Sequence, residues 1–128
     1  MLGEDSGLEV DALGGRPGVE TARWAQGRHV ERILAALAGV ADRRARYVCE
    51  LVAIAPDGRE LRGRGTLEGS IAFQARGTAG FGFDPVFVPA GEERTVAELG
   101  DEWKREHSHR GRAAKALLAV LASSAGPR

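Results

Sequence analysis

Two carboxylates stand side by side near the start of the sequence, in the stretch GEDSG at residues 3–7. Mg²⁺ is held in proteins by oxygen ligands, and a carboxylate next to a bound metal can orient or deprotonate an attacking water. Glu4 and Asp5 would supply that chemistry if both reached one cavity. The same stretch also fits a solvated acidic turn with Ser6 as a cap. The residues by themselves favour the turn, because adjacent acidic residues are common.

A second candidate is the stretch GFGFDP at residues 80–85, in which aromatic residues alternate with glycines. If the stretch is extended, Phe81 and Phe83 project to one face, and an aromatic ring beside glycines can stack on a flat base. Asp84 precedes a proline and is therefore held extended. Two core phenylalanines in a glycine-rich strand would give the same pattern, and the residues support both interpretations equally.

A third candidate is KREHSHRG at residues 104–111. Ser108 is placed to cap the helix that follows, which leaves free N–H groups and a positive dipole end. His109 and Arg110 add donors there, and arginine presents parallel donors suited to a carbonyl or a phosphate. Lys104 is a point charge nearby. A solvated basic turn is the alternative, but His and Arg together at a cap are unusual and favour a binding site.

The elements that must position these groups follow from periodicity. Apolar residues at i, i+3, i+4 and i+7 predict a helix over 28–40. The apolar run ARYVCELVAIA at 45–55 predicts a buried strand, and the PDGR turn leads to a returning, glycine-rich strand over 60–72. The stretch GLEVDALGG at 7–15 gives a weaker strand signal.

The C-terminal half continues with helices. TVAEL at 95–99 carries a capping-box pattern for a short helix, and the last helix is predicted over about 109–122. Its expected buried stripe consists of Ala114, Leu117, Leu118 and Leu121. The order strand, helix, hairpin, aromatic turn, helix predicts an α/β fold, a mixed sheet with helices packed on it.

Composition limits the functional classes. The 128 residues suit one domain, spanning 1–128. Eighteen basic and 18 acidic residues give a formal net charge of zero, which argues against binding a nucleic acid polymer. Cys49 lies in an apolar run and is expected to be a buried thiol. Neither a signal peptide nor a membrane-length apolar run is recognisable, so we expect a cytoplasmic protein without membrane contact.

Each candidate stretch is weak evidence alone, but the three together, in their order along the chain, are much stronger evidence. EDSGLEVDALGGRPGVETARWA, GTAGFGFDPVFVP, TVAEL and SHRGRAAKAL closely resemble the inosine triphosphate pyrophosphatase family, enzymes that remove non-standard purine nucleotides. The resemblance runs from Glu4 to about Leu121, and three of its blocks are highly specific in combination. It implies an elongated mixed β-sheet with flanking helices. It also implies conversion of ITP, dITP and XTP to the monophosphate and pyrophosphate, with Mg²⁺ as cofactor and a homodimer as assembly.

The resemblance further implies residue roles. Asp5 matches the catalytic, metal-associated aspartate, with Glu4 beside it as the second candidate metal ligand, and Ser6 matches a substrate-binding position. The residues matching the nucleotide-contacting block are Phe81, Gly82, Phe83 and Asp84. Those matching the groups that hold the base and its keto oxygen are Lys104, His109 and Arg110. Such groups can donate hydrogen bonds to an oxygen at position 6 of a purine, and they discriminate against the amino group of adenine, which is itself a donor.

Two departures from the family pattern bear on activity. Phe83 stands where the family often has Tyr or Trp, so a hydroxyl or indole N–H is lost. The family's first strand and helix, with a loop and a lysine that cradle the phosphates, have no counterpart before Asp5, and we expect a fragment, a misplaced start or a degraded copy. The chain alone is predicted to be nearly inactive. The alternative function is a catalytically inactive remnant that at most binds a purine nucleotide or a partner subunit.

Overall fold

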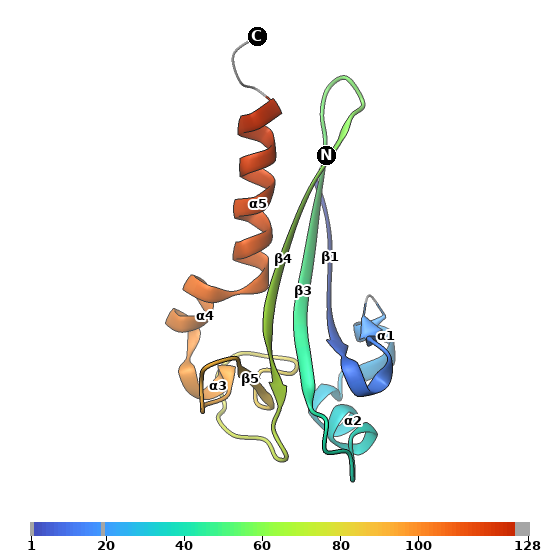
Figure 1. Cartoon of the computed structure of the whole chain (residues 1–128), viewed down its shortest axis with the longest axis vertical. Coiled ribbons are helices and arrows are strands. Elements are labelled where there is room, and N and C mark those ends of the chain that lie inside the picture. The colour runs from blue at the N-terminus through green and yellow to red at the C-terminus, as the bar shows by residue number, and fades with distance from the viewer. Residues whose placement is uncertain (1, 19, 125–128) are drawn as a thin grey trace.

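A five-stranded antiparallel sheet forms the centre of the fold (Figure 1). The computed structural model describes residues 2–18 and 20–124, with side-chain surroundings up to residue 121. The strands are β1 (Leu2–Val10), β2 (Arg16–Gly18), β3 (Arg44–Ile54), β4 (Glu60–Ile71) and β5 (Phe87–Pro89), in the spatial order β2-β1-β3-β4-β5. All four pairings between these strands are antiparallel.

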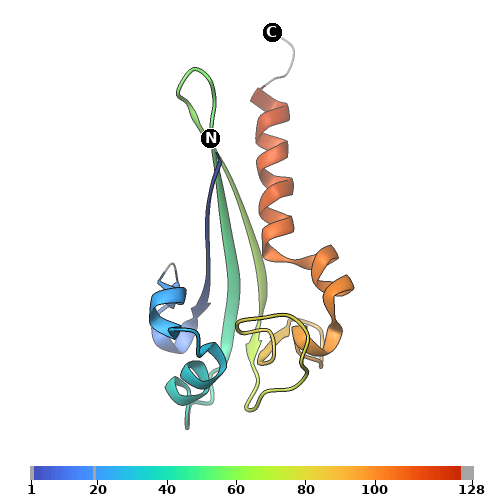
Figure 2. The same cartoon turned by 180° about the vertical axis from the view of Figure 1, so that it is seen from behind.

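The long β3–β4 hairpin gives the molecule its elongated shape, as both views show (Figures 1 and 2). The turn between the two strands is closed by a hydrogen bond from the Gly58 N–H to the Ala55 carbonyl at 2.9 Å. β1 runs along the other side of β3, with Leu2 opposite Ala53 and Val10 opposite Ala45. β3 is therefore the central strand, which explains why Ala45, Cys49 and Leu51 are buried along it.

Helices flank this sheet. They are the 3₁₀ helix η1 (Asp11–Leu13) and the α-helices α1 (Thr21–Ala25), α2 (His29–Ala36), α3 (Val96–Leu99), α4 (Asp101–His107) and α5 (His109–Ser124). α1 and α2 lie at one end of the sheet beside β1, whereas α3 and α4 lie at the same end beside β4 (Figure 1). α5 runs along the hairpin toward its turn. Helices therefore lie beside β1 on one side of the sheet and beside β4 on the other.

The main hydrophobic core lies at the end of the sheet where α1, α2 and α3 gather. Phe87, Leu8 and Ile33 are among its fully buried side chains. Ile33 and Leu37 are the most buried positions of the predicted apolar face at 28–40, which is confirmed as α2. Burial of each such side chain contributes about 1.5–3 kcal/mol, so this end is the firmly packed part of the fold.

α5 packs directly against the backbone of β4. A Cβ on Gly63 would lie 2.3 Å from the Leu117 nitrogen, and one on Gly65 would lie 2.2 Å from the His109 carbonyl oxygen. The glycines of β4 therefore allow the backbone of α5 to approach the strand closely, and this contact sets where along β4 the helix begins.

This packing corrects the predicted buried stripe of the last helix. The helix itself is confirmed, but Ala113 and Leu117 are its buried residues, whereas Leu118 is 64% exposed and Leu121 is 37% exposed. The apolar pattern alone could not identify the buried side of the helix, because that side is set by Ala113 and Leu117, whose backbones approach Gly63 and Gly65.

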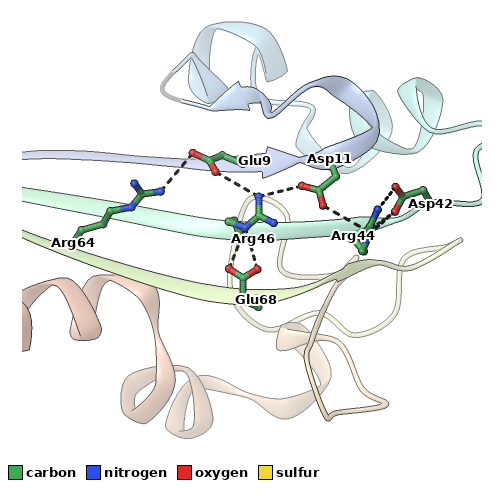
Figure 3. A network of polar contacts seen from close by, with 7 residues as sticks. All are labelled: Glu9, Asp11, Asp42, Arg44, Arg46, Arg64 and Glu68. Carbon is green, nitrogen blue, oxygen red and sulfur yellow. Dashed lines mark hydrogen bonds and ion pairs between the residues drawn. The ribbon is translucent and has the colours of Figure 1, made fainter.

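The sheet face turned away from α5 carries charged side chains (Figure 3). Arg46 lies at the centre of this network and contacts Glu68 at 3.0 Å and Asp11 at 3.1 Å. Glu9 and Arg64 extend the network along the strands. Partly exposed pairs of this kind contribute about 0–1 kcal/mol each to stability. The network therefore marks a polar face of the sheet and adds little to the stability of the fold.

The structure agrees with the predicted α/β class with flanking helices. The capping box of α3 is present: Thr95 Oγ1 accepts a hydrogen bond from the Glu98 N–H, and Glu98 accepts one from the Thr95 N–H. Cys49 is fully buried, as expected. Among the described residues, none of the helices has the length and hydropathy needed to cross a membrane.

Candidate functional site

A cleft of about 360 Å³ opens where β1, β3, the turn at 80–84 and the junction of α4 with α5 come together. It gathers residues that are more than 100 positions apart in the sequence. The predicted substrate-binding residues that line it are Ser6, Phe81, Gly82, Phe83, Asp84, Lys104, His109 and Arg110. All eight predicted substrate-binding residues therefore lie at one cavity, although they come from three separate stretches.

Asp84 is the polar centre of the cleft wall and is only 2% exposed. Its Oδ2 accepts hydrogen bonds from Lys104 Nζ at 2.6 Å and from the Phe81 N–H at 3.0 Å, and its Oδ1 accepts one from the Tyr47 hydroxyl at 3.0 Å. The Asp84 carbonyl also accepts the N–H of Ala97 in α3. A buried carboxylate needs such donors to offset its lost hydration, and here the donors are themselves parts of the site.

The turn at 80–84 depends on its glycines. Gly80 has φ +78°, and a Cβ there would lie 2.2 Å from Asp84 Oδ2. Gly82 has φ +62°, a conformation that side-chain-bearing residues rarely adopt. The chain therefore folds tightly around the Asp84 carboxylate, which is why the turn can present Phe81 at its tip.

This turn corrects the prediction that Phe81 and Phe83 project to one face. The stretch is not extended, so the two rings separate. Phe81 is 69% exposed and has Lys104 Nζ 3.8 Å from its ring centroid, whereas Phe83 is 3% exposed and packs edge-on against His29. Only Phe81 presents a broad ring to solvent at the cleft, and Phe83 belongs to the core beneath it.

His109 begins α5 and forms part of the cleft floor. Its imidazole stacks on the ring of Tyr47, with centroids 4.9 Å apart and an 18° angle between the planes. Burial, reinforced by the positive charges of Arg110 and Lys104, lowers the pKa of His109 to about 4. The imidazole is thus neutral near pH 7, when it has one donor and one acceptor nitrogen. The predicted Ser108 cap is present, since Ser108 Oγ accepts the Gly111 N–H at 3.0 Å.

Arg110 connects the last helix to the first strand. Its Nε donates to Glu4 Oε1 at 2.8 Å, and Ser6 Oγ donates to the same oxygen at 2.9 Å. Partial burial opposes a lower pKa for Glu4, but the hydrogen bonds from Ser6 and Arg110 outweigh it and lower that pKa. Glu4 thus holds the Arg110 guanidinium at the cleft rim, and its carboxylate is already hydrogen-bonded to Arg110 and Ser6.

The structure does not bring Glu4 and Asp5 together. Neighbouring residues of a strand point to opposite faces, and Glu4 and Asp5 are both within β1. Asp5 is exposed and lines a second cavity of about 300 Å³ on the polar face, together with Glu50, Arg62 and others. The two cavities share Ser6 and Gly7. A metal held by both carboxylates at once does not fit this geometry, and the described residues contain no cluster of three or more His, Cys, Asp or Glu side chains able to hold one.

Several cleft residues were missed by the sequence analysis. They include Tyr47, His29 and Thr21. Thr21 Oγ1 accepts the Leu8 N–H at 3.1 Å and donates to the Gly18 carbonyl at 2.6 Å, which ties α1 to β1. For Tyr47 a signal was available, because it is the only tyrosine of the chain and stands in a buried apolar strand. A hydroxyl in such a strand normally has a polar partner.

Nearly the whole sequence matches one known protein family. A profile described as the Ham1 family matches residues 1–120. The chain belongs to the Ham1 family. The resemblance inferred from the three motif blocks is thereby confirmed, since curated relatives of this Ham1 chain carry the name dITP/XTP pyrophosphatase.

Two of these relatives illustrate the similarity. The dITP/XTP pyrophosphatase of Symbiobacterium thermophilum is 52% identical over 94% of this chain, and that of Gloeobacter violaceus is 49% identical over 91%. The Ham1 chain spans 63% and 61% of their respective lengths. It therefore covers less than two thirds of the curated relatives it matches.

Solved structures agree with this assignment. The Staphylococcus aureus Ham1 protein superposes with a TM-score of 0.89 at 38% identity, covering 96% of this chain and 67% of that structure. A nucleoside-triphosphatase, dITP/XTP pyrophosphatase, from Mycobacterium abscessus superposes with a TM-score of 0.80 at 44% identity, covering 94% of this chain and 65% of that one. The described fold is thus the Ham1 fold over the length of this chain.

Proposed function

We propose that this chain carries the base-recognising and catalytic residues for the hydrolysis of non-standard purine nucleoside triphosphates (ITP, dITP and XTP) to the monophosphate and pyrophosphate. The observation that carries the proposal is the gathering of Phe81, Asp84, Lys104, His109 and Arg110 at one cleft. Relatives named dITP/XTP pyrophosphatase support the substrate class.

Base recognition is the part of the reaction that the cleft supports best. Lys104 and Arg110 present charged donors, and the neutral His109 presents one more. A purine with an oxygen at position 6 offers an acceptor to these groups, whereas the amino group of adenine would face donors with a donor. Unpaired buried polar groups cost about 1–3 kcal/mol each, enough to favour inosine and xanthosine nucleotides.

Asp5 is proposed as the catalytic carboxylate. It is exposed and lies next to Ser6, the residue at which the two cavities meet. A triphosphate whose base occupies the cleft would reach Asp5 by passing over the Ser6–Gly7 segment. There the carboxylate would orient a water and accept its proton.

Mg²⁺ is the proposed cofactor. When bound it neutralises phosphate charge, and it is commonly held by one or two carboxylates together with substrate phosphates. Asp5 fits that role because it is exposed, whereas Glu4 is already hydrogen-bonded to Arg110 and Ser6. Of the two predicted ligands, Asp5 is therefore the one we retain. We further propose, from family membership, that the active protein is a homodimer.

A second candidate function is nucleotide binding without hydrolysis. It is favoured by one observation: Asp5 lies on the opposite sheet face from the groups that hold the base. In that case the chain would bind ITP through its cleft and release no pyrophosphate.

The deciding experiment measures pyrophosphate release from ITP by the purified 128-residue chain, with and without Mg²⁺, beside equilibrium binding of ITP. Mg²⁺-dependent turnover that is lost in Asp5→Asn supports hydrolysis. Binding without turnover supports the second candidate. Tight binding of ATP and ITP alike would contradict both, because neither allows an amino group at position 6.

A further inference from the structure

We propose that Tyr47 is a positioning residue for base recognition, acting through Asp84 and His109 without contacting the base itself. The inference rests on the proposed function of the cleft and deepens it. Tyr47 lies in β3, the central strand, where its register partners are Leu8 on β1 and Leu67 on β4. Both partners are buried in the core, so the backbone that carries Tyr47 is held on both sides.

The hydroxyl of Tyr47 is one of two restraints that this residue places on the cleft. It donates to Asp84 Oδ1 at 3.0 Å, while Asp84 Oδ2 accepts from Lys104 and from the Phe81 N–H. Rotation about χ2 moves both carboxylate oxygens, so the Tyr47 hydroxyl on Oδ1 adds a restraint on the far side of the group from the two donors on Oδ2. The Tyr47 hydroxyl therefore fixes the plane of the carboxylate, and with it the place of Lys104 over Phe81.

The ring of Tyr47 supplies the second restraint. One part of it packs on Phe87, with centroids 4.4 Å apart, and it stacks on the His109 imidazole at 4.9 Å. Phe87 is fully buried, so the tyrosine ring transmits the position of the core to the first residue of α5. The orientation of the imidazole plane, which decides where its donor nitrogen points, is set by this stack.

These two restraints act on groups from separate segments. Asp84 belongs to the turn after β4, and His109 belongs to α5. Tyr47 contacts both of them, Asp84 through its hydroxyl and His109 through its ring. We infer that Tyr47 sets the relative placement of Lys104 and His109, and that base selectivity depends on this placement more than overall affinity does.

The primary test compares Tyr47→Phe with the unchanged chain in equilibrium binding of ITP and ATP. The phenylalanine keeps the ring and its stack but removes the hydroxyl. We expect the ratio of ITP affinity to ATP affinity to fall about fivefold to tenfold, as for loss of one charge-linked hydrogen bond, with ATP affinity unchanged. An unaltered ratio in Tyr47→Phe would overturn the proposal.

A matched control separates positioning from general destabilisation. Ile71→Val removes one buried methyl group from the same core cluster at a residue that does not line the cleft. It should lower stability and leave the affinity ratio as in the unchanged chain. If Ile71→Val reduced the ratio as much as Tyr47→Phe, the effect would be one of core packing and the positioning role would be wrong.

A second measurement needs no nucleotide. In Tyr47→Phe the NMR signals of the Phe81 amide and the Lys104 side chain should shift, since both donate to the Asp84 carboxylate, while the Gly39 amide at the far end of α2 should not. Because Tyr47 is the only tyrosine, a single ¹³Cζ signal also reports its hydroxyl, and Asp84→Asn should move that signal. Unchanged signals would contradict the coupling.

The outcomes for the two proposals are distinguishable. If the unchanged chain shows no preference for ITP over ATP, the proposed function fails, and the NMR comparison still decides whether Tyr47 positions Asp84. If the unchanged chain prefers ITP and Tyr47→Phe retains that preference, the function stands and the role of Tyr47 is wrong.

Discussion

At the scale of single residues, Asp84 connects most of the cleft. It receives hydrogen bonds from Tyr47, Phe81 and Lys104, and it is almost completely buried. Removing one partner of a buried, hydrogen-bonded charge usually costs more than the pair contributes. The shape of the cleft therefore depends on a buried carboxylate whose two oxygens already accept hydrogen bonds within the protein. The exposed ring of Phe81 and the groups at the start of α5 remain available to bind a ligand.

Arg110→Ala should weaken ITP binding by roughly 1–3 kcal/mol, the cost of leaving a polar partner without its donor. The change also releases Glu4, whose carboxylate now accepts from Arg110 and Ser6. Arg112→Ala is the matched control, since Arg112 lies two residues along the same helix, outside the cleft, and donates to the Thr66 carbonyl. Binding isotherms for ITP provide the comparison. Equal affinities for the two variants would remove Arg110 from the binding site.

His109 predicts a dependence of stability on pH. Its pKa is about 4 in the folded chain and about 6.5 as a free side chain, so the unfolded chain binds more protons between these values. The stabilisation is complete above about pH 6.5 and decreases as the pH falls toward 4, by on the order of 2–3 kcal/mol. Urea unfolding at several pH values measures it. His109→Asn should flatten this dependence, and an unchanged slope in that variant would assign the effect to other groups.

At the scale of elements, the contact between α5 and β4 determines where the groups proposed to recognise the base lie. Gly63 and Gly65 allow the helix backbone to approach the strand directly. Because Gly65 meets His109 and Ala113 within the first turns of α5, the same contact that packs the helix also sets the height of His109 above the sheet. Packing and recognition are thus coupled through a residue without a side chain.

Gly65→Ala should destabilise the fold and displace the start of α5. The added Cβ would lie 2.2 Å from the backbone of Ala113 and His109, and overpacking of this kind costs about 1–3 kcal/mol or more. Gly3→Ala is the control, because nothing lies within 4 Å of its Cβ position. Chemical unfolding and ITP binding should both worsen for Gly65→Ala and change little for Gly3→Ala. Similar stability of the two variants would show that the helix can shift without cost.

At the scale of the whole molecule, β1 forms an open edge. Its pairing with β2 is confined to Leu8–Val10, so within residues 2–18 and 20–124 no strand pairs with the outer side of Leu2–Gly7. Unpaired strand edges template association with other strands. This stretch also carries Asp5 and Ser6, so any partner strand would lie next to the proposed reaction site.

We expect the 128-residue chain to self-associate through this edge. Leu2, which is 66% exposed, should promote it, and Leu2→Lys should reduce it because edge lysines oppose strand pairing. Leu118→Lys changes the exposed side of α5 and serves as the comparison. Sedimentation velocity over a range of concentrations distinguishes the two. Dissociation by Leu118→Lys alone would place the interface on the helix.

Much of the site was accessible from the sequence, but its geometry was not. The motif blocks identified eight residues that line the cleft, all of them proposed to bind substrate. Periodicity located α2 and β3, and the spacing of Thr95 and Glu98 located the capping box of α3. Motifs depend on local residue order, which a sequence preserves. The contact line of α5 and the separation of Phe81 from Phe83 depend on which glycines receive a neighbouring backbone or adopt positive φ, and these are properties of tertiary packing.

The sequence also could not predict that Glu4 and Asp5, which are adjacent in the chain, point to opposite faces of the sheet. The side chains of sequence neighbours can lie together in a turn, but in a strand they point to opposite faces of the sheet. The weak strand signal covers only residues 7–15, and the sequence favours a turn at Glu4 and Asp5, whereas the strand begins at Leu2. Tyr47 was missed for the opposite reason. Its partners Asp84 and His109 are 37 and more positions away, so only the folded chain relates them.

The closure of the cleft by α5 has a consequence for synthesis of the protein. All five strands precede α5 in the chain, and chains fold from the N-terminus as they leave the ribosome. Until α5 emerges, the glycine-lined face of β4 and the adjoining Cys49 and Leu51 remain uncovered by the helix that buries them. The nascent sheet is therefore expected to expose apolar surface until α5 follows it, and α5 both covers that surface and completes the proposed nucleotide site.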